Sequence, residues 1–182
     1  GGYNAFKAGP GGKWRAHEPP AVIDEFVELA YLMREWVGPE AELCFDFHGK
    51  MTPGMAIEVC HEIKGMRPMF VEEPVPQENV AALNQVSDHV PYPIATGERV
   101  ITKYEFAELL NKQAAQILQL DLGQCGGIME GKKIAGMAEA HYAQIAPHLY
   151  CGPIEGAANI QLGTCSPNFL IQESIETWGG FH

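Results

Sequence analysis

The sequence has few basic residues: 12 Lys and Arg stand against 23 Asp and Glu, a formal net charge of −11 at pH 7. No basic stripe is present, so a nucleic-acid partner is not expected, because phosphate backbones attract clustered Lys and Arg. No uninterrupted apolar run reaches the roughly 20 residues that span a bilayer, so no membrane partner is expected either.

Several motifs of nucleotide and nucleophile chemistry are also absent. The sequence contains no GxSxG, Walker or GxGxxG pattern, and Gly126 and Gly127 lack the spacing that cradles a phosphate. The five cysteines form no CxxC pair and no zinc spacing, and GGYNAFKAGP lacks the regions of a signal peptide. We therefore expect reduced thiols in a cytoplasmic protein, and no nucleophilic role for Cys151, although it lies close to His148.

What the sequence does contain is an ionisable residue at the end of each strand-like apolar run, at intervals of 23 to 27 residues. The segments between these runs have helical spacing, so the chain predicts a parallel sheet with outer helices. In a parallel α/β barrel the carboxyl ends of the strands form the face that carries the chemistry. The ionisable residues at these ends are Asp46, His48, Glu72, Glu73, Glu98, Asp121, His148 and Glu173.

Two helical segments have clear signals. Thr102, with Glu105 three residues later, predicts a capping box at the start of one helix. The segment 21–37 predicts another helix, with an apolar face made of Val22, Phe26, Leu29, Met33 and Trp36.

The expected fold is one α/β domain, residues 1–182, built as a modified (β/α) TIM-like barrel. About seven strands are recognisable, from YNAFK to FLIQE, whereas a complete eight-stranded barrel takes about 250 residues. We therefore expect an incomplete barrel with parts lacking at both ends. Exposed apolar edges favour association, so a homo-oligomer is expected.

The acids at three consecutive strand ends predict a metal site. Adjacent strands lie about 4.8 Å apart, so Asp46, an acid of the Glu72–Glu73 pair, and Glu98 would crowd together and repel unless a cation neutralises them. Oxygen ligands without Cys or His favour a hard ion such as Mg²⁺. Side chains alternate along a strand, so only one of Glu72 and Glu73 faces the site, and the pattern does not choose between them.

Two histidines are candidates for proton transfer. Asp46 and His48 are two residues apart, so on one strand both would face the same side, which places an imidazole beside a metal carboxylate. His148 and Asp121 end neighbouring strands, where the carboxylate would orient the ring and raise its basicity. The spacing therefore predicts a general-base pair.

Six segments between about residues 1 and 175 carry a family resemblance: FDFHGK, FVEEPVPQEN, PIATGERV, QLDLGQCGGIMEGKKIAGMAEA, APHLYCGPIEGAANIQL and NFLIQE. They resemble the mandelate racemase group of the enolase superfamily, and within it the sugar-acid dehydratases of the galactonate dehydratase type. The resemblance implies a barrel domain. It also implies that an N-terminal capping domain, the first barrel strand and a C-terminal segment are absent from this chain.

The resemblance implies Mg²⁺ ligands at Asp46, Glu72 and Glu98. In this family the first acid of the EEP motif ligates the metal. Glu73 is then a supporting residue beside the ligands, which we group with the substrate-binding residues.

The resemblance also implies roles in proton transfer. His148 with Asp121 matches the general-base pair of the family, and His48 matches the imidazole that such dehydratases use as general acid. Glu173 matches the acid that hydrogen-bonds the oxyanion of the substrate carboxylate.

Lys7 lies in the strand where racemases of this group carry a Lys-x-Lys pair, and is expected to bind substrate, but the second position is Gly9. This departure disfavours a two-base racemase. The expected activity is that of a Mg²⁺-dependent hydro-lyase. It would remove the C2 proton of a small-molecule sugar acid, eliminate the 3-hydroxyl and yield a 2-keto-3-deoxy acid. The alternatives are a racemase or epimerase of a 2-hydroxy acid, and a catalytically silent barrel fragment.

Overall fold

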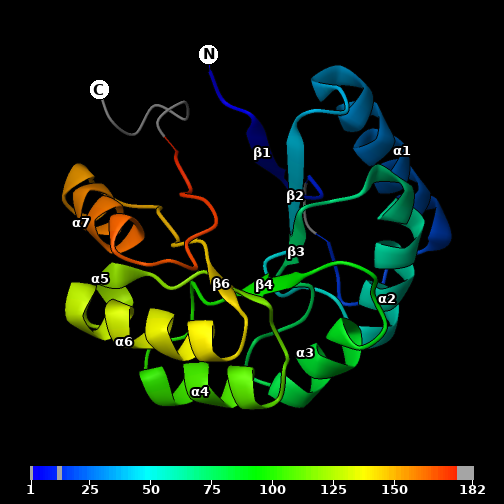
Figure 1. The fold of residues 1–182 in the computed structure, drawn as a ribbon. Helices are drawn as coiled ribbons and strands as arrows, with labels where there is room; N and C mark the ends of the chain where they lie inside the picture. Colours follow the sequence, from blue (N-terminus) through cyan, green and yellow to red (C-terminus); the bar gives the residue numbers. More distant parts are fainter. Residues whose placement is uncertain (1, 12–13, 176–182) are drawn as a thin grey trace. The chain divides into compact units, whose positions relative to one another are not determined.

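The computed structural model describes residues 2–11 and 14–175. The chain divides into two compact units, Gly1–Ile94 and Ala95–His182, and strands alternate with helices in both (Figure 1). The elements of unit 1 are β1 (Ala5–Ala8), α1 (Pro20–Val37), β2 (Glu42–Asp46), α2 (Pro53–Glu62), the 3₁₀ helix η1 (Ile63–Met66), β3 (Phe70–Glu72) and α3 (Val80–Ser87). β4 (Ile94–Thr96) begins at the last residue of unit 1, and unit 2 continues with α4 (Lys103–Asn111), β5 (Ile117–Leu118), α5 (Leu122–Cys125), α6 (Gly127–Ala140), β6 (Gln144–Ile145) and α7 (Pro153–Thr164).

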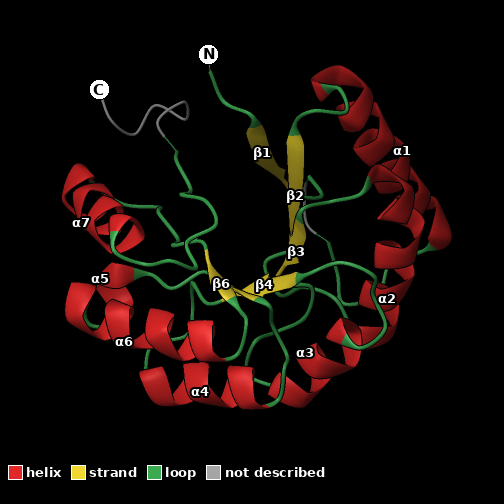
Figure 2. Ribbon diagram, in the orientation of Figure 1, coloured by secondary structure: helices red, strands yellow, loops and turns green. Residues whose placement is uncertain are grey.

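In unit 1 the strands pair in parallel. β1 pairs with β2, and β2 pairs with β3 so that Asp46 is the register partner of Glu72. Helices α1 and α2 lie on the same side of β2 and β3 (Figure 2). From Leu43 to Asp46, β2 is buried at every position, which is typical of a parallel strand covered on both faces.

An aromatic cluster supports the end of β2. The ring of Phe26 on α1 meets Phe45 and Phe47 edge to face, at centroid distances of 5.7 and 5.4 Å. Trp14 adds a further edge contact to Phe26 at 5.3 Å. Such pairs contribute about 0.5–1.5 kcal/mol each beyond the area they bury. The cluster therefore fixes the backbone on both sides of Asp46.

The buried face of α1 differs from the predicted one. Phe26 is buried as expected, but its partners on the core side are Ile23 and Ala30. Leu29 and Trp36 are exposed, with 69% of Trp36 open to solvent. The apolar residues form a stripe broader than the buried face of the helix, so part of it lies outside the core.

Among the described residues, no helix combines the length and apolar character needed to cross a membrane.

Unit 2 repeats the parallel arrangement. Within it, Thr96 of β4 is the register partner of Leu118 on β5, and Leu118 is the partner of Ile145 on β6. The expected seventh strand, at FLIQE, forms only an isolated parallel bridge between Ile145 and Phe169. The described residues thus contain six strands and this bridge. The parallel pairing and the strand–helix alternation confirm the predicted α/β class.

The predicted capping box opens α4. The Thr102 hydroxyl accepts a hydrogen bond from the Glu105 amide at 3.4 Å, and the Glu105 carboxylate accepts one from the Thr102 amide at 2.7 Å. The second bond satisfies the Thr102 amide at the start of the helix, and the Glu105 amide also donates to the Thr102 carbonyl at 3.0 Å. The bonds from the Thr102 side chain and backbone also hold the pKa of Glu105 below its ordinary value of 4.5.

We expect Thr102→Ala to lower the free energy of unfolding by about 1 kcal/mol at neutral pH. The folded-state pKa of Glu105 is depressed, so its contribution is present above the unfolded-state pKa and is lost as the pH falls through the folded value. The difference in free energy of unfolding between Thr102→Ala and the unmodified protein, measured in urea, should therefore become smaller in acid. Thr164→Ala, at an exposed threonine on α7, should change stability by less than about 0.5 kcal/mol. If this difference in free energy of unfolding does not change with pH, ionised Glu105 does not stabilise the helix through the capping box.

Candidate active site

Two buried carboxylates meet at the ends of β2 and β3. Asp46 and Glu72 are the last residues of their strands and register partners, with 5% and 0% of their surfaces exposed. The Lys7 amine on β1 lies 2.8 Å from Glu72 Oε2 and 3.9 Å from Asp46 Oδ2. Buried like charges need a compensating cation. An oxygen donor pair of this kind suits a hard divalent ion, so the two residues could hold Mg²⁺.

Gly9 has a structural reason to be glycine. A Cβ atom at this position would lie 2.4 Å from the Asp46 carbonyl oxygen, well inside van der Waals contact. The chain after β1 therefore approaches β2 too closely for any side chain at residue 9. This excludes, in this backbone, a second lysine two residues after Lys7.

His48 is close to Asp46, but not through strand alternation. β2 ends at Asp46, and His48 lies in a turn with a left-handed φ of 51°. The turn brings His48 Nε2 to 3.0 Å from Asp46 Oδ2, and the His48 amide donates to Asp46 Oδ1 at 2.8 Å. The prediction that His48 shares a strand face with Asp46 is therefore wrong, because the pleat stops before His48. The exposed ring nevertheless lies against the carboxylate.

Glu73 also lies beyond its strand. β3 ends at Glu72, and Glu73 has a left-handed φ of 38°. It is buried, and its carbonyl accepts a hydrogen bond from the Gly49 amide at 2.7 Å. Side-chain alternation therefore does not apply to Glu73, because the strand ends at Glu72. A role for Glu73 in substrate binding stays a prediction.

The other predicted site residues belong to unit 2, where His148 and Asp121 form a pair. Asp121 caps the N-terminus of α5, with Oδ1 accepting from the Gln124 amide at 2.9 Å. Its second oxygen, Oδ2, lies 2.8 Å from His148 Nδ1. In the neutral tautomer that this bond favours, Nδ1 carries the proton and Nε2 is left as the basic nitrogen.

Two carboxylates of unit 2 lie near His148 Nε2. The Oε2 atom of Glu98, two residues after β4, is 3.3 Å away, and the Oε2 atom of Glu173 is 3.9 Å away. Glu173 Oε2 also accepts a hydrogen bond from the Leu149 amide at 2.8 Å. Gly97, before Glu98, has a φ of 146°, and a Cβ there would lie 2.8 Å from the Gln119 amide nitrogen. The turn that presents Glu98 therefore requires glycine, which the sequence reasoning did not anticipate.

The thiol of Cys151 is protonated at neutral pH. Burial, then the hydrogen bond and charge of Glu155, raise the pKa of Cys151 to about 12. The thiolate is the nucleophilic form of cysteine. A nucleophilic role for Cys151 is therefore disfavoured, as the sequence led us to expect.

Asn159 is a polar residue near the pair that the sequence reasoning missed. It lies on α7, is 0% exposed, and donates through Nδ2 to the His148 carbonyl at 3.0 Å. The only sequence signal is its position three residues before Leu162, which places a polar side chain on the buried stripe of the helix.

Parallel strand ends that carry acids and imidazoles define the class of this chain: an α/β domain with paired carboxylate and histidine groups. The family model described as "Enolase C-terminal domain-like" matches residues 1–180. The chain belongs to this family, within the enolase superfamily, and its solved relatives are mandelate racemase/muconate lactonizing enzyme-like proteins and dehydratases by name. The predicted superfamily and its barrel-like domain are thereby confirmed.

Solved structures resemble the chain over nearly its whole length. A protein from Burkholderia SAR-1, provisionally named a mandelate racemase/muconate lactonizing enzyme, is 50% identical with a TM-score of 0.93, covering 100% of this chain and 46% of its own. A mandelate racemase/muconate lactonizing enzyme-like protein from Roseovarius sp. TM1035 is 47% identical, with a TM-score of 0.91 and coverage of 96% and 45%. A provisionally named dehydratase from Mesorhizobium loti is 36% identical, with a TM-score of 0.92 and coverage of 97% and 48%. The chain thus spans about half the length of these proteins.

Proposed function

We propose that this chain is the catalytic part of a Mg²⁺-dependent dehydratase that converts a sugar acid into a 2-keto-3-deoxy acid. The observation that carries the proposal is the carboxylate-held imidazole in each unit, His148 on Asp121 and His48 on Asp46. An elimination needs one base for the C2 proton and one acid for the 3-hydroxyl. Family membership and the relative named as a dehydratase support the same reaction class.

We propose that Asp46, Glu72 and Glu98 hold the Mg²⁺. The fit to a metal rests on the buried, register-paired carboxylates of Asp46 and Glu72, which offer oxygen alone. Glu98, the acid that ends the next strand-like run, completes the set. When bound, the ion supplies positive charge that stabilises the carboxylate of the substrate as its C2 proton leaves.

His148 is the proposed base for the C2 proton. The bond from Nδ1 to Asp121 leaves Nε2 to accept the proton, and the carboxylate stabilises the imidazolium that forms. Because the proton on C2 is a weak acid, charge must be absorbed at the substrate carboxylate as it is removed. Glu173, as the protonated acid, donates a hydrogen bond to this developing oxyanion, and the Lys7 amine contributes to substrate binding.

His48 is the proposed acid for the second half of the reaction. In its protonated form it donates a proton to the 3-hydroxyl, the C3–O bond breaks and water leaves. The electron pair released from the C2–H bond forms the enol, which tautomerises to the 2-keto-3-deoxy acid. Glu73 supports the turn beside the ligands.

The test is proton NMR in D₂O with Mg²⁺ and a panel of aldonic acids, on the protein with any residues beyond this chain retained. A new C3 methylene beside a ketone is the expected result. Deuterium entering C2 without elimination would instead support a racemase or epimerase of a 2-hydroxy acid; two of the relatives above have "mandelate racemase" in their names. Neither signal with any acid would support a catalytically silent barrel.

A further inference from the structure

The peptide unit between His148 and Leu149 is held from both sides. Its carbonyl oxygen accepts a hydrogen bond from Asn159 Nδ2 at 3.0 Å, and its amide donates to Glu173 Oε2 at 2.8 Å. The amide of His148 itself donates to the Leu120 carbonyl at 3.2 Å. The backbone that carries the proposed base is therefore fixed at three points, two of which are side chains.

Asn159 has a free-energy cost at its buried position. It is 0% exposed, and its Oδ1 is buried without a hydrogen-bond partner among the described residues. A buried polar atom without a partner costs about 1–3 kcal/mol. A leucine would fill the same buried stripe of α7 at no such cost, so packing alone does not explain an amide here. The bond to the His148 carbonyl is the contact that the amide makes and a leucine could not.

We infer that Asn159 is a positioning residue for His148, an inference that rests on the proposed role of His148 as base. The hydrogen bond sets the plane of the His148–Leu149 peptide, and with it the direction in which the imidazole leaves the backbone. That direction keeps Nδ1 at 2.8 Å from Asp121 Oδ2 and Nε2 in one orientation. Displacement of a reacting group by about 1 Å can cost 10²-fold in rate.

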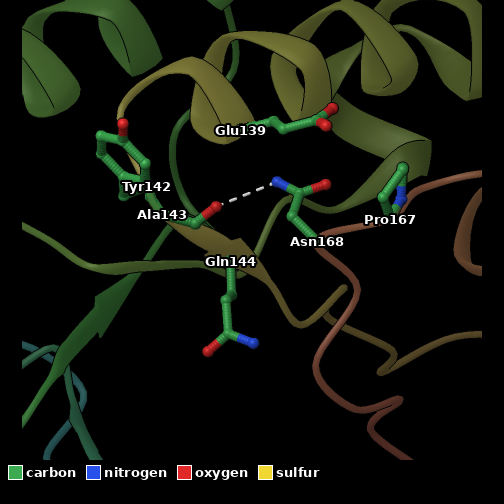
Figure 3. A pocket seen from close by; sticks show the side chains of 6 residues that line it. All are labelled: Glu139, Tyr142, Ala143, Gln144, Pro167 and Asn168. Carbon is green, nitrogen blue, oxygen red and sulfur yellow. Dashed lines mark hydrogen bonds between the residues drawn. The ribbon is translucent and has the colours of Figure 1, made fainter.

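Asn168 provides a matched control within the same unit. Its Nδ2 donates to the carbonyl oxygens of Ala143 at 2.9 Å and Ala135 at 3.1 Å. Figure 3 shows the bond to Ala143, directly before β6; both residues line a pocket of about 240 Å³. Asn168 therefore holds the start of β6 through hydrogen bonds to backbone carbonyls. Asn159 holds the segment after β6 in the same way. It has the same donor chemistry, but its two side-chain hydrogen bonds go to Ala135 and Ala143 and not to the His148–Leu149 peptide.

The first experiment compares Asn159→Leu with Asn168→Leu in the protein with all its residues. Asn159→Leu is expected to lower kcat and the rate of C2 exchange about 10- to 100-fold, with KM changed less than about twofold. Asn168→Leu should lower the melting temperature but leave kcat within about twofold. If kcat falls equally in both variants and in proportion to their loss of stability, Asn159 has only a structural role. That result would overturn the inference. If Asn159→Leu fails to fold, the smaller Asn159→Ser, which also withdraws the amide, takes its place.

A second readout needs no substrate. In protein labelled with ¹⁵N-histidine, the Nδ1–H proton of His148 should give a downfield resonance because it is held by Asp121. Asn159→Leu is expected to shift or broaden this resonance, and Asn168→Leu to leave it unchanged. If the resonance responds in this way while no aldonate reacts, the proposed function fails and the positioning role stands. An unchanged resonance in Asn159→Leu overturns the inference whatever the activity.

Discussion

Replacement of His148 by asparagine should lower the rate of product formation and the rate of deuterium incorporation at C2, each by at least about 10³-fold. Asparagine keeps a hydrogen-bonding group near Asp121 but has no basic nitrogen to accept the proton. Proton removal precedes every later step in the proposed sequence. The loss must therefore appear equally in the exchange rate and in the rate of dehydration.

Replacement of His48 should separate the two rates. His48→Asn removes the proposed acid for the 3-hydroxyl, so dehydration should fall about 10²- to 10³-fold while C2 exchange persists. His141→Asn, at an exposed histidine after α6, should leave both rates unchanged. Proton NMR in D₂O measures both rates in one sample. Loss of exchange in His48→Asn to the same extent as in His148→Asn would remove the separate roles.

The ends of the strands were predictable from sequence because buried parallel strands are short apolar runs. In β2 and β3 the run ends at Asp46 and Glu72, and the register places the two acids side by side. Local pattern was enough to find Asp46 and the Glu72–Glu73 pair, although it did not choose between the two glutamates. The interval between successive runs reflects one strand, one helix and their connections, and it repeats because the architecture repeats.

The residues just beyond the strands were less predictable. His48 and Glu73 both have left-handed backbone conformations, which non-glycine residues adopt rarely. Alternation of side chains applies only while the chain is extended, so it gave the wrong reason for His48 and no choice for Glu73. The approach of Gly9 to the Asp46 carbonyl depends on β1 and β2 meeting, and is not encoded in local pattern.

Long-range packing also decided which apolar residues form the core. Helical spacing found α1 but selected Leu29 and Trp36 for the buried face, whereas Ile23 and Ala30 are the residues buried beside Phe26. An apolar stripe wider than its partner surface leaves some members exposed, and the sequence does not say which. Asn159 escaped notice for the related reason that its partner, the His148 carbonyl, is a backbone atom.

The proposed metal site predicts a stability that depends on Mg²⁺. A ligand that binds only the folded state at 100 times its Kd adds about 2.7 kcal/mol. For a domain of this size, that free energy raises the melting temperature by roughly 5–10 °C. We expect Glu72→Gln to lose this increment, because the amide keeps the shape of the side chain but not the charge that attracts the ion.

The control is Glu42→Gln, at the exposed start of β2, on the same strand as Asp46 but at its opposite end. It removes the same charge from unit 1, so it should keep the full Mg²⁺ increment if the effect comes from a specific site and not from net charge. Glu98→Gln extends the test to unit 2, where an equal loss of the increment is expected if Glu98 is the third ligand. If Glu72→Gln keeps the Mg²⁺-dependent rise in melting temperature, the proposed metal site is wrong. Loss in Glu72→Gln with retention in Glu98→Gln would leave Mg²⁺ bound by the carboxylates of unit 1, with Glu98 left to interact with His148 Nε2.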